Sequence, residues 1–142
     1  MILMLLGVMM VSGCVNRAKL NQTTLEDYNA GNYFYAARWH DSNFSGYIGA
    51  TKATCPDIIE QHKVTEAYIK LYWDLEKEIT ALAVDGIEGD DLYEINSRKL
   101  KRRSISGYVP NNRDYLVSQR ASENCQLMAE GKIPNTEPIT DW

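Results

Sequence analysis

The sequence predicts an all-α fold, a small bundle of about four helices built as one domain. Three observations support this prediction. Apolar residues recur at spacings of three and four along the second half of the chain, no segment shows the sustained apolar–polar alternation of a strand, and Gly and Pro separate the periodic segments. We expect the helical domain to span residues 25–130, followed by an irregular tail at 131–142.

The longest predicted helix begins at Cys55-Pro56-Asp57 and ends near Gly86. Pro56 suits the first helical position, where no backbone hydrogen bond is lost, and Asp57 suits the positive end of the helix dipole. Gly86 is typical of a helix end. The apolar residues between them follow the spacing of a core-facing stripe: Ile58, Ile59, Ala67, Tyr68, Leu71, Tyr72, Leu75, Ile79 and Leu82.

Two more helices are predicted after a turn at 86–91. Asp90 or Asp91 caps a third helix that continues to about Ile105, because a carboxylate can accept hydrogen bonds from the first helical N–H groups. A fourth helix spans about 113–130, with apolar residues again at helical spacing.

Shorter patterns precede the longest helix. Apolar residues over 25–40 are interrupted by a Gly-Asn pair, and Asn32 suits the N-cap of a helix over 33–40. Residues 41–54 are rich in Ser, Gly and Thr and predict a loop or a short helix.

Residues 31–39 (GNYFYAARW) resemble the start of the second helix of a tetratricopeptide repeat, in which Gly and a capping residue precede an aromatic and a small residue. No second copy stands at the spacing of about 34 residues that such arrays need. We therefore interpret the stretch as a preference for a helix–turn–helix.

The first eleven residues form an apolar run. This run is too short for the roughly 20 apolar residues that span a bilayer, but it has the length of the apolar part of a secretory signal. Val11-Ser12-Gly13-Cys14 follows and resembles the lipobox of bacterial lipoproteins. The resemblance implies a signal segment at 1–13, cleavage before Cys14, a covalent lipid on Cys14 and a lipidated tether at 14–24.

Two details qualify this leader. A secretory signal normally begins with Lys or Arg, and residues 1–13 contain neither, so either the leader is unusually short or translation starts upstream. The alternative interpretation of this segment is a buried apolar helix with an incidental cysteine. In the enterobacterial lipoprotein pattern an Asp directly after the cysteine retains the protein at the inner membrane, and Val15 stands there instead. The resemblance therefore implies the periplasmic face of the outer membrane, if the host is Gram-negative.

The other two cysteines, Cys55 and Cys125, predict a structural disulfide, because exported chains meet an oxidising compartment. The bridge would close a loop of about 70 residues and stabilise the fold by about 3–5 kcal/mol in the chain-entropy model. The alternative is a reactive thiol at Cys55, whose pKa a helix N-terminus would lower.

Few residues suggest catalysis, a metal or a nucleic acid. The net charge is −4 with acids and bases interspersed, which is not the clustered basic face of a nucleic-acid-binding protein. His40 and His62 lack a metal-ligand spacing, although His62 could meet Glu66 one turn along a helix. The acidic pairs Asp90-Asp91 and Glu76/Glu78 have the pattern of solvated groups. We expect no catalytic residue, no metal and no cofactor beyond the lipid on Cys14.

Two surfaces are candidates for partner contact. The basic run Lys99–Arg103 would suit an anionic lipid headgroup or an acidic partner, or it is simply a polar helix face. Aromatic residues are denser elsewhere than one face of a short helix can bury, which predicts a contact surface there. They are Tyr33, Tyr35, Trp39, Phe44 and Tyr47.

These observations favour a non-enzymatic lipoprotein that binds another envelope protein, as an accessory of a secretion, pilus or other envelope machine. The alternative is an immunity or exclusion lipoprotein that binds a toxin, phage or conjugation component. Residues 45–49, followed by Cys55-Pro56, are faintly similar to small periplasmic immunity proteins, although the cysteine arrangement differs. A cell-wall enzyme is the third hypothesis and has no supporting motif. The sequence leaves the oligomeric state open.

Overall fold

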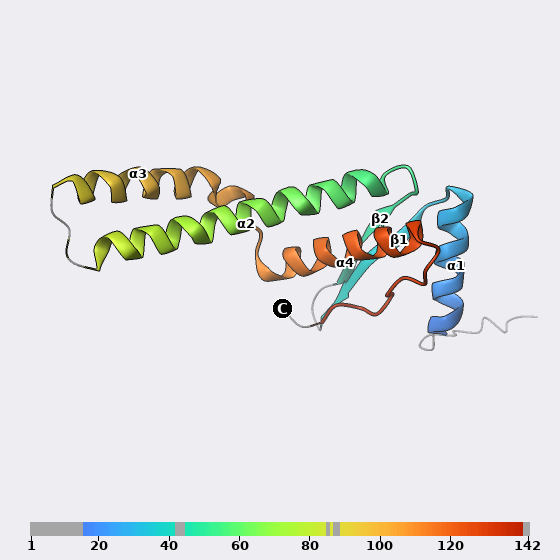
Figure 1. The fold of residues 1–142 in the computed structure, drawn as a ribbon. Helices are drawn as coiled ribbons and strands as arrows, with labels where there is room; N and C mark the ends of the chain where they lie inside the picture. Colours follow the sequence, from blue (N-terminus) through green and yellow to red (C-terminus); the bar gives the residue numbers. More distant parts are fainter. Residues whose placement is uncertain (1–15, 42–44, 85, 87–88, 141–142) are drawn as a thin grey trace, which may run out of the picture.

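The computed structural model describes residues 16–41, 45–84, 86 and 89–140, and over these ranges it contains four α-helices and one two-stranded antiparallel sheet. Figure 1 shows α2 running along most of the molecule, with α3 beside one end and the remaining elements gathered at the other. The signal segment, Cys14 and Phe44 lie outside the described residues. In chain order the elements are α1 (Arg17–Ala30), β1 (Phe34–His40), β2 (Ser45–Ala50), α2 (Cys55–Ala83), α3 (Asp90–Ile105), the 3-10 helix η1 (Ser106–Tyr108) and α4 (Asn112–Ala129).

The three helices predicted in the second half of the chain are confirmed. Pro56 lies in the first turn of α2 with Asp57, as their preferences require. Asp90 and Asp91 lie in the first turn of α3, but the prediction that one of them caps this helix is wrong, because Gly89 is at the N-cap position and no side chain forms a capping hydrogen bond. The side chain of Asn111 caps α4 by accepting a hydrogen bond from the Asp114 N–H at 2.8 Å. With 29 residues, α2 is about 44 Å long, which is enough to join two separate packing regions.

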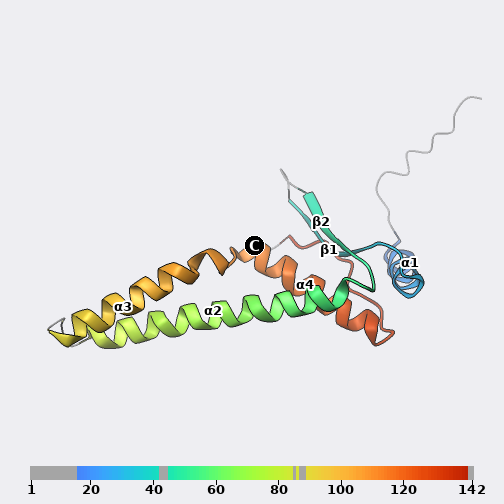
Figure 2. The ribbon, with the colours of Figure 1, turned by 90° about the horizontal axis from the view of Figure 1, so that it is seen from above.

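The first region is a helical pair that we call the distal hairpin, residues 71–105. Figures 1 and 2 both show the C-terminal half of α2 and α3 side by side and projecting away from the other elements. Leu75, Ile95 and Ile105 are its buried residues among those described. Ion pairs between α3 and α2 join Arg98 to Glu78 and Arg102 to Glu76.

The second region, which we call the body, contains α1, the strand pair, the N-terminal half of α2, α4 and the tail. The strand β1 packs against α4, and α4 also lies along α2. One hydrophobic cluster unites these elements. Its buried members are Tyr28, Phe34, Ala36, Ala37, Ala50, Cys55, Val117, Ala121, Cys125, Met128 and Ile139.

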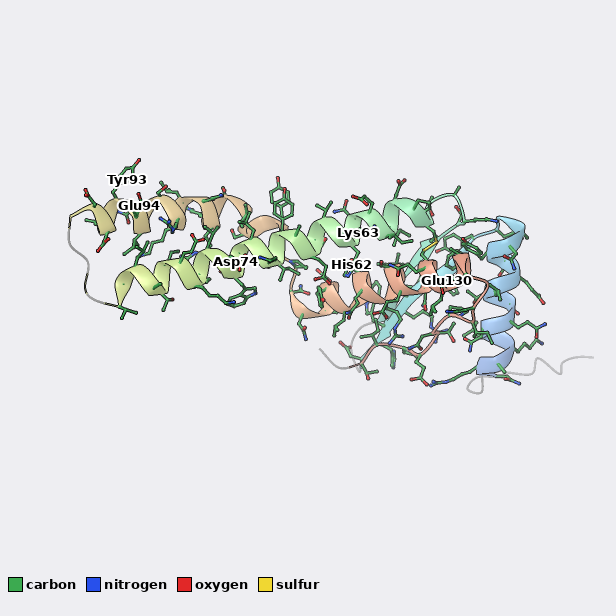
Figure 3. The ribbon with its side chains drawn as sticks, viewed as in Figure 1. His62, Lys63, Asp74, Tyr93, Glu94 and Glu130 are labelled. Carbon is green, nitrogen blue, oxygen red and sulfur yellow. A yellow bond between two sulfur atoms is a disulfide. The ribbon has the colours of Figure 1, made fainter. Side chains whose placement is uncertain are left out.

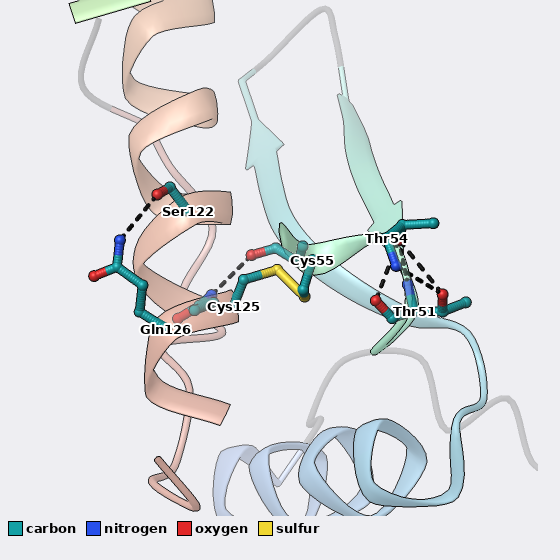
Figure 4. The surroundings of a disulfide bond; sticks show 8 residues. Thr51, Thr54, Cys55, Ser122, Cys125 and Gln126 are labelled. Carbon is teal, nitrogen blue, oxygen red and sulfur yellow. Dashed lines mark hydrogen bonds between the residues drawn. A yellow bond between two sulfur atoms is a disulfide. The ribbon is translucent and has the colours of Figure 1, made fainter. Parts of the chain in front are cut away.

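A disulfide between Cys55 and Cys125 joins the start of α2 to α4, with their Cα atoms 5.4 Å apart (Figure 4). Both cysteines are buried. The turn before Cys55 is fixed by Thr51 and Thr54, since the Thr51 N–H donates to the Thr54 hydroxyl at 2.8 Å and the Thr54 N–H donates to the Thr51 carbonyl at 3.1 Å. The bridge therefore holds β2 and α2 at a defined place on α4.

The prediction of a purely helical fold is wrong over residues 33–50. The segment that resembles a tetratricopeptide helix forms β1, and the expected loop or short helix after it contains β2. A bulge between Tyr35 and Ala37 puts Ala36 and Ala37 both into the core. This bulge breaks the two-residue alternation by which a strand is recognised in a sequence.

The polar segment that we interpreted as a tether forms, from Arg17 onward, the first half of α1. Asn16 caps this helix by accepting hydrogen bonds from the N–H groups of Ala18 and Lys19. Asn16 supplies a helix start that the apolar pattern does not reveal, because α1 buries only Thr24 and Tyr28.

The described part of the C-terminal tail, residues 131–140, contains no helix but lies against β1 and α4. Ile139 is buried and exchanges two backbone hydrogen bonds with β1, to the Arg38 carbonyl and from the His40 N–H. The buried side chain of Asn124 donates to the carbonyls of Ala36 and Asn135 and accepts from the Asn135 N–H, all at 2.7–2.8 Å. β1 therefore has an extended neighbour at each edge, β2 at one and the tail at the other.

Candidate functional site

The outward surface of the strand pair carries three tyrosines in mutual contact, Tyr33, Tyr35 and Tyr47, which we call the tyrosine face. Their exposed fractions are 52%, 42% and 53%. The ring centroids of Tyr35 and Tyr47 are 4.5 Å apart, and those of Tyr33 lie 5.9 Å from Tyr35 and 6.4 Å from Tyr47. Three large aromatic side chains that are half exposed and already packed on one another form an apolar patch with hydroxyl tips.

The local sequence explains why the rings meet. In β1, Phe34 points into the core, so its neighbour Tyr35 points out. Tyr35 is opposite Gly49 in the sheet register. A side chain at Gly49 would overlap the Tyr33 ring and hydroxyl, so the glycine makes room for Tyr33 to lie over β2. Tyr47 then closes the cluster from the neighbouring strand.

Arg38 and a shallow depression extend this surface. Arg38 is the register partner of Tyr47, so it belongs to the same side of the sheet. A depression of about 540 Å³ lies beside Tyr35, Arg38 and Tyr47, and its rim includes Pro138 of the tail. Tyr and Arg, together with Trp, are the residue types most enriched among the energetically dominant contacts of protein interfaces.

The phenol of Tyr33 stays uncharged at neutral pH. Partial loss of hydration, followed by a hydrogen bond with Tyr47 and the nearby Tyr47 and Tyr35 phenols, raises the pKa of Tyr33 above its ordinary value. A neutral aromatic patch loses less hydration energy on being covered than a charged one does.

The structure brings together three of the five aromatic residues that the sequence singled out. Tyr33, Tyr35 and Tyr47 share the outer face, whereas Trp39 packs against the core on the inner face and lies over Gly46, although its edge reaches the depression. Phe44 lies outside the described residues. Sequence reasoning missed Arg38, because only the strand register places it beside Tyr47.

A second polar arrangement joins α2 to α4. His62 Nδ1 lies 2.9 Å from the Ser118 hydroxyl, and His62 Nε2 lies 3.1 Å from Glu66 (Figure 3 labels His62). Tyr115 donates to the same carboxylate at 2.9 Å, and this hydrogen bond raises the pKa of Tyr115. Ser, His and a carboxylate in hydrogen-bonded sequence also occur in hydrolases.

The position of Ser118 favours a structural role for this arrangement. Ser118 lies inside α4, where the surrounding backbone N–H groups are used by helical hydrogen bonds. The backbone N–H groups beside Ser118 are therefore not available to stabilise an oxyanion, as such donors do in acyl transfer. Among the described residues, no three His, Cys, Asp or Glu side chains are grouped so that they could hold a metal ion.

The basic run lies on the distal hairpin. Its member Arg102 is paired with Glu76, whereas Lys99, Lys101 and Arg103 make no ion pair with a described residue. Lys99 and Arg103 border a depression of about 630 Å³ that Tyr72 and Leu100 also line. This surface mixes positive charge with apolar area, but unlike the tyrosine face it has a single aromatic residue, Tyr72, among the residues that line it.

No described helix is both long and apolar enough to cross a membrane. Comparisons with protein-family models, with curated proteins and with solved structures each find no match to this chain.

Proposed function

We propose that this protein is a lipid-anchored envelope protein that binds another envelope protein through its tyrosine face, as a non-enzymatic accessory of a larger envelope assembly. The observation that carries the proposal is the cluster of Tyr33, Tyr35 and Tyr47, half exposed and in ring contact on one side of the sheet. A partner that covers a patch of this kind gains binding free energy, since each aromatic ring offers a large apolar area at a small cost in conformational entropy.

The construction of the body supports this role. The sheet that carries the tyrosines is packed on α4, and the disulfide ties α2 to the same helix. The tail covers the other edge of β1 through the two backbone hydrogen bonds of Ile139. The tyrosine face is therefore pre-organised, which lowers the entropic cost of binding.

The lipobox resemblance supports the location. If the lipid is attached to Cys14, only Val15 separates it from Asn16, which caps α1. Such a short connection would hold the start of α1 within about 10 Å of the membrane, since an extended residue spans roughly 3.5 Å. The proposed partner is therefore one that presents its binding segment close to the bilayer, at the periplasmic face of the outer membrane in a Gram-negative host.

Site-specific crosslinking in cells tests the proposal. A photoreactive amino acid is placed at Tyr35 or Tyr47, with a matched variant at Tyr93, which is 74% exposed on the distal hairpin (Figure 3). We expect adducts with an envelope protein from positions 35 and 47 and none from position 93. Adducts confined to position 93, or none at all, would contradict the proposal.

The captured partner also separates the accessory role from the protective alternative. A component of a secretion or pilus machine supports the accessory role proposed here. Capture of an incoming toxin, phage or conjugation protein would replace that role with immunity or exclusion.

Labelling with an alkyne fatty acid tests the lipid anchor. Wild-type protein should take up the label, and a Cys14→Ser chain that still takes it up would place the lipid elsewhere.

A further inference from the structure

The strand β2 is the open edge of the sheet. The opposite edge, along β1, is occupied by the tail, because the Ile139 N–H donates to the Arg38 carbonyl and the His40 N–H donates to the Ile139 carbonyl. In the sheet, β2 pairs with β1 alone. Among the described residues, no further backbone segment is hydrogen-bonded to Ser45–Ala50.

The register shows which backbone groups of β2 face outward. Arg38 and His40 direct their backbone groups toward the tail, so Trp39 and Ala37 direct theirs toward β2. The register partners of these last two residues, Gly46 and Ile48, face β1 in return. By alternation, the N–H and C=O groups of Ser45, Tyr47 and Gly49 point into the open edge. An edge with unpaired donors and acceptors is a template for an added strand.

A groove runs beside this edge. Its volume is about 470 Å³, and it lies between β2, the first two turns of α2 and the middle of α4. Gly49 lines it through its backbone, and Ile48, Ile58 and Ala121 supply apolar walls. An added strand would therefore find hydrogen-bonding groups on one side and apolar space for alternate side chains on the other.

One wall of the groove also carries a negative charge. The carboxylate of Asp57 borders it and forms no ion pair with a described residue. Charge complementarity at this wall favours a ligand with Lys or Arg at the matching position.

We infer that the groove between β2 and α2 binds an extended segment of the partner as an added β-strand, with alternating apolar side chains and one basic residue. This inference rests on the proposed function and specifies the form of the partner.

The experiment uses the purified chain with its disulfide formed and a phage-displayed library of random linear peptides as the probe. We expect enriched peptides to alternate apolar residues and to contain Lys or Arg. An enriched peptide should slow hydrogen exchange at the outward amides of Tyr47 and Gly49, with no comparable change at the inward amide of Ile48. Enrichment of no peptide, or binding without protection of Tyr47 and Gly49, would overturn the inference.

Three variants localise the binding. Gln61→Trp fills the groove from an exposed position on α2 and should weaken the peptide at least about tenfold, or roughly 1.4 kcal/mol. Asp57→Asn removes the charge of an exposed side chain and should weaken it by about two- to fivefold. Tyr93→Ala on the distal hairpin should leave its affinity unchanged. Unchanged affinity in both groove variants contradicts the inference. Crosslinking from Tyr35 in cells would still stand in that case, so the proposed function and the added strand can fail separately.

Discussion

The body and the distal hairpin are stabilised by different kinds of interaction. In the body, residues from α1, both strands, α2, α4 and the tail meet in one buried cluster, and a disulfide links two of these elements. In the distal hairpin, two helices bury Leu75, Ile95 and Ile105 and add ion pairs along their edge. The comparison indicates that the body is the rigid platform of the molecule, whereas the distal hairpin depends on a single helix–helix contact.

The same difference applies to their surfaces. On the body, three half-exposed tyrosines are in mutual ring contact on the tyrosine face. On the distal hairpin, Tyr72 and Trp73 form one edge-to-face pair on α2, with ring centroids 5.5 Å apart, and Tyr93 is exposed on the separate helix α3. A partner that requires a preformed patch would therefore use the body.

Removing the disulfide should have the largest effect and should act on the body. We expect the double variant Cys55→Ala/Cys125→Ala to lose about 3–5 kcal/mol of the free energy of unfolding, because the unfolded chain regains the freedom that a long closed loop removes. Urea denaturation followed by circular dichroism measures the loss. A change below about 1 kcal/mol would show that the body does not depend on the bridge.

Truncating the core of the distal hairpin should break only that region. Ile95 is 1% exposed between α3 and α2, and Ile95→Ala should cost about 2–5 kcal/mol through lost burial and a cavity. Hydrogen exchange should speed up across α3 while the exchange rates in β1 and β2 stay unchanged. Leu100→Ala is the control, since Leu100 is 68% exposed and its loss should change stability by no more than about 0.5 kcal/mol. Equal acceleration in the strands would mean that the two regions unfold as one.

The attachment of the tail depends on one buried amide. Asn124→Ala leaves the carbonyls of Ala36 and Asn135 and the Asn135 N–H without their side-chain partner, which should cost about 1–3 kcal/mol. Limited proteolysis should then cleave the tail near residue 135 faster than in wild type. An unchanged cleavage rate would show that Ile139 alone holds the tail.

The ion pairs of the distal hairpin should contribute least. A double-mutant cycle on Arg102→Gln and Glu76→Gln should give a coupling of about 0.2–1 kcal/mol, because both side chains remain partly exposed to screening solvent. The coupling should shrink as salt is added. A coupling well above 1 kcal/mol would make electrostatics, rather than the buried isoleucines, the main support of this hairpin.

The sequence predicts the long helices well because their signals are local. Pro56, Asp57 and a sustained apolar stripe define α2, and acidic first turns mark α3 and α4. The strands were missed because the bulge at Ala36 hides their alternation, and because Gly46 and Gly49 lower the apolar content of β2. These glycines are explained only by long-range contacts, with the rings of Trp39 and Tyr33.

The candidate site, like the fold, is predictable from the sequence only where its signal is local. The density of aromatic residues predicts a contact surface near Tyr35, but it gives no indication that the residues lie on a sheet or that Trp39 turns inward. The buried amide of Asn124 and the groove beside β2 join segments far apart in the sequence. Such contacts depend on the tertiary fold and leave no local pattern.

The affinity of the tyrosine face for the partner captured in cells tests the central claim most directly. We expect Tyr35→Ala/Tyr47→Ala to weaken the complex by about 1000-fold, since truncating an interface aromatic of this kind costs about 2 kcal/mol, or about 4 kcal/mol for the two. The melting temperature should change only slightly, because both rings are half exposed, and Tyr93→Ala should alter neither quantity. Wild-type affinity in the double variant, or unfolding of that variant, would contradict the account.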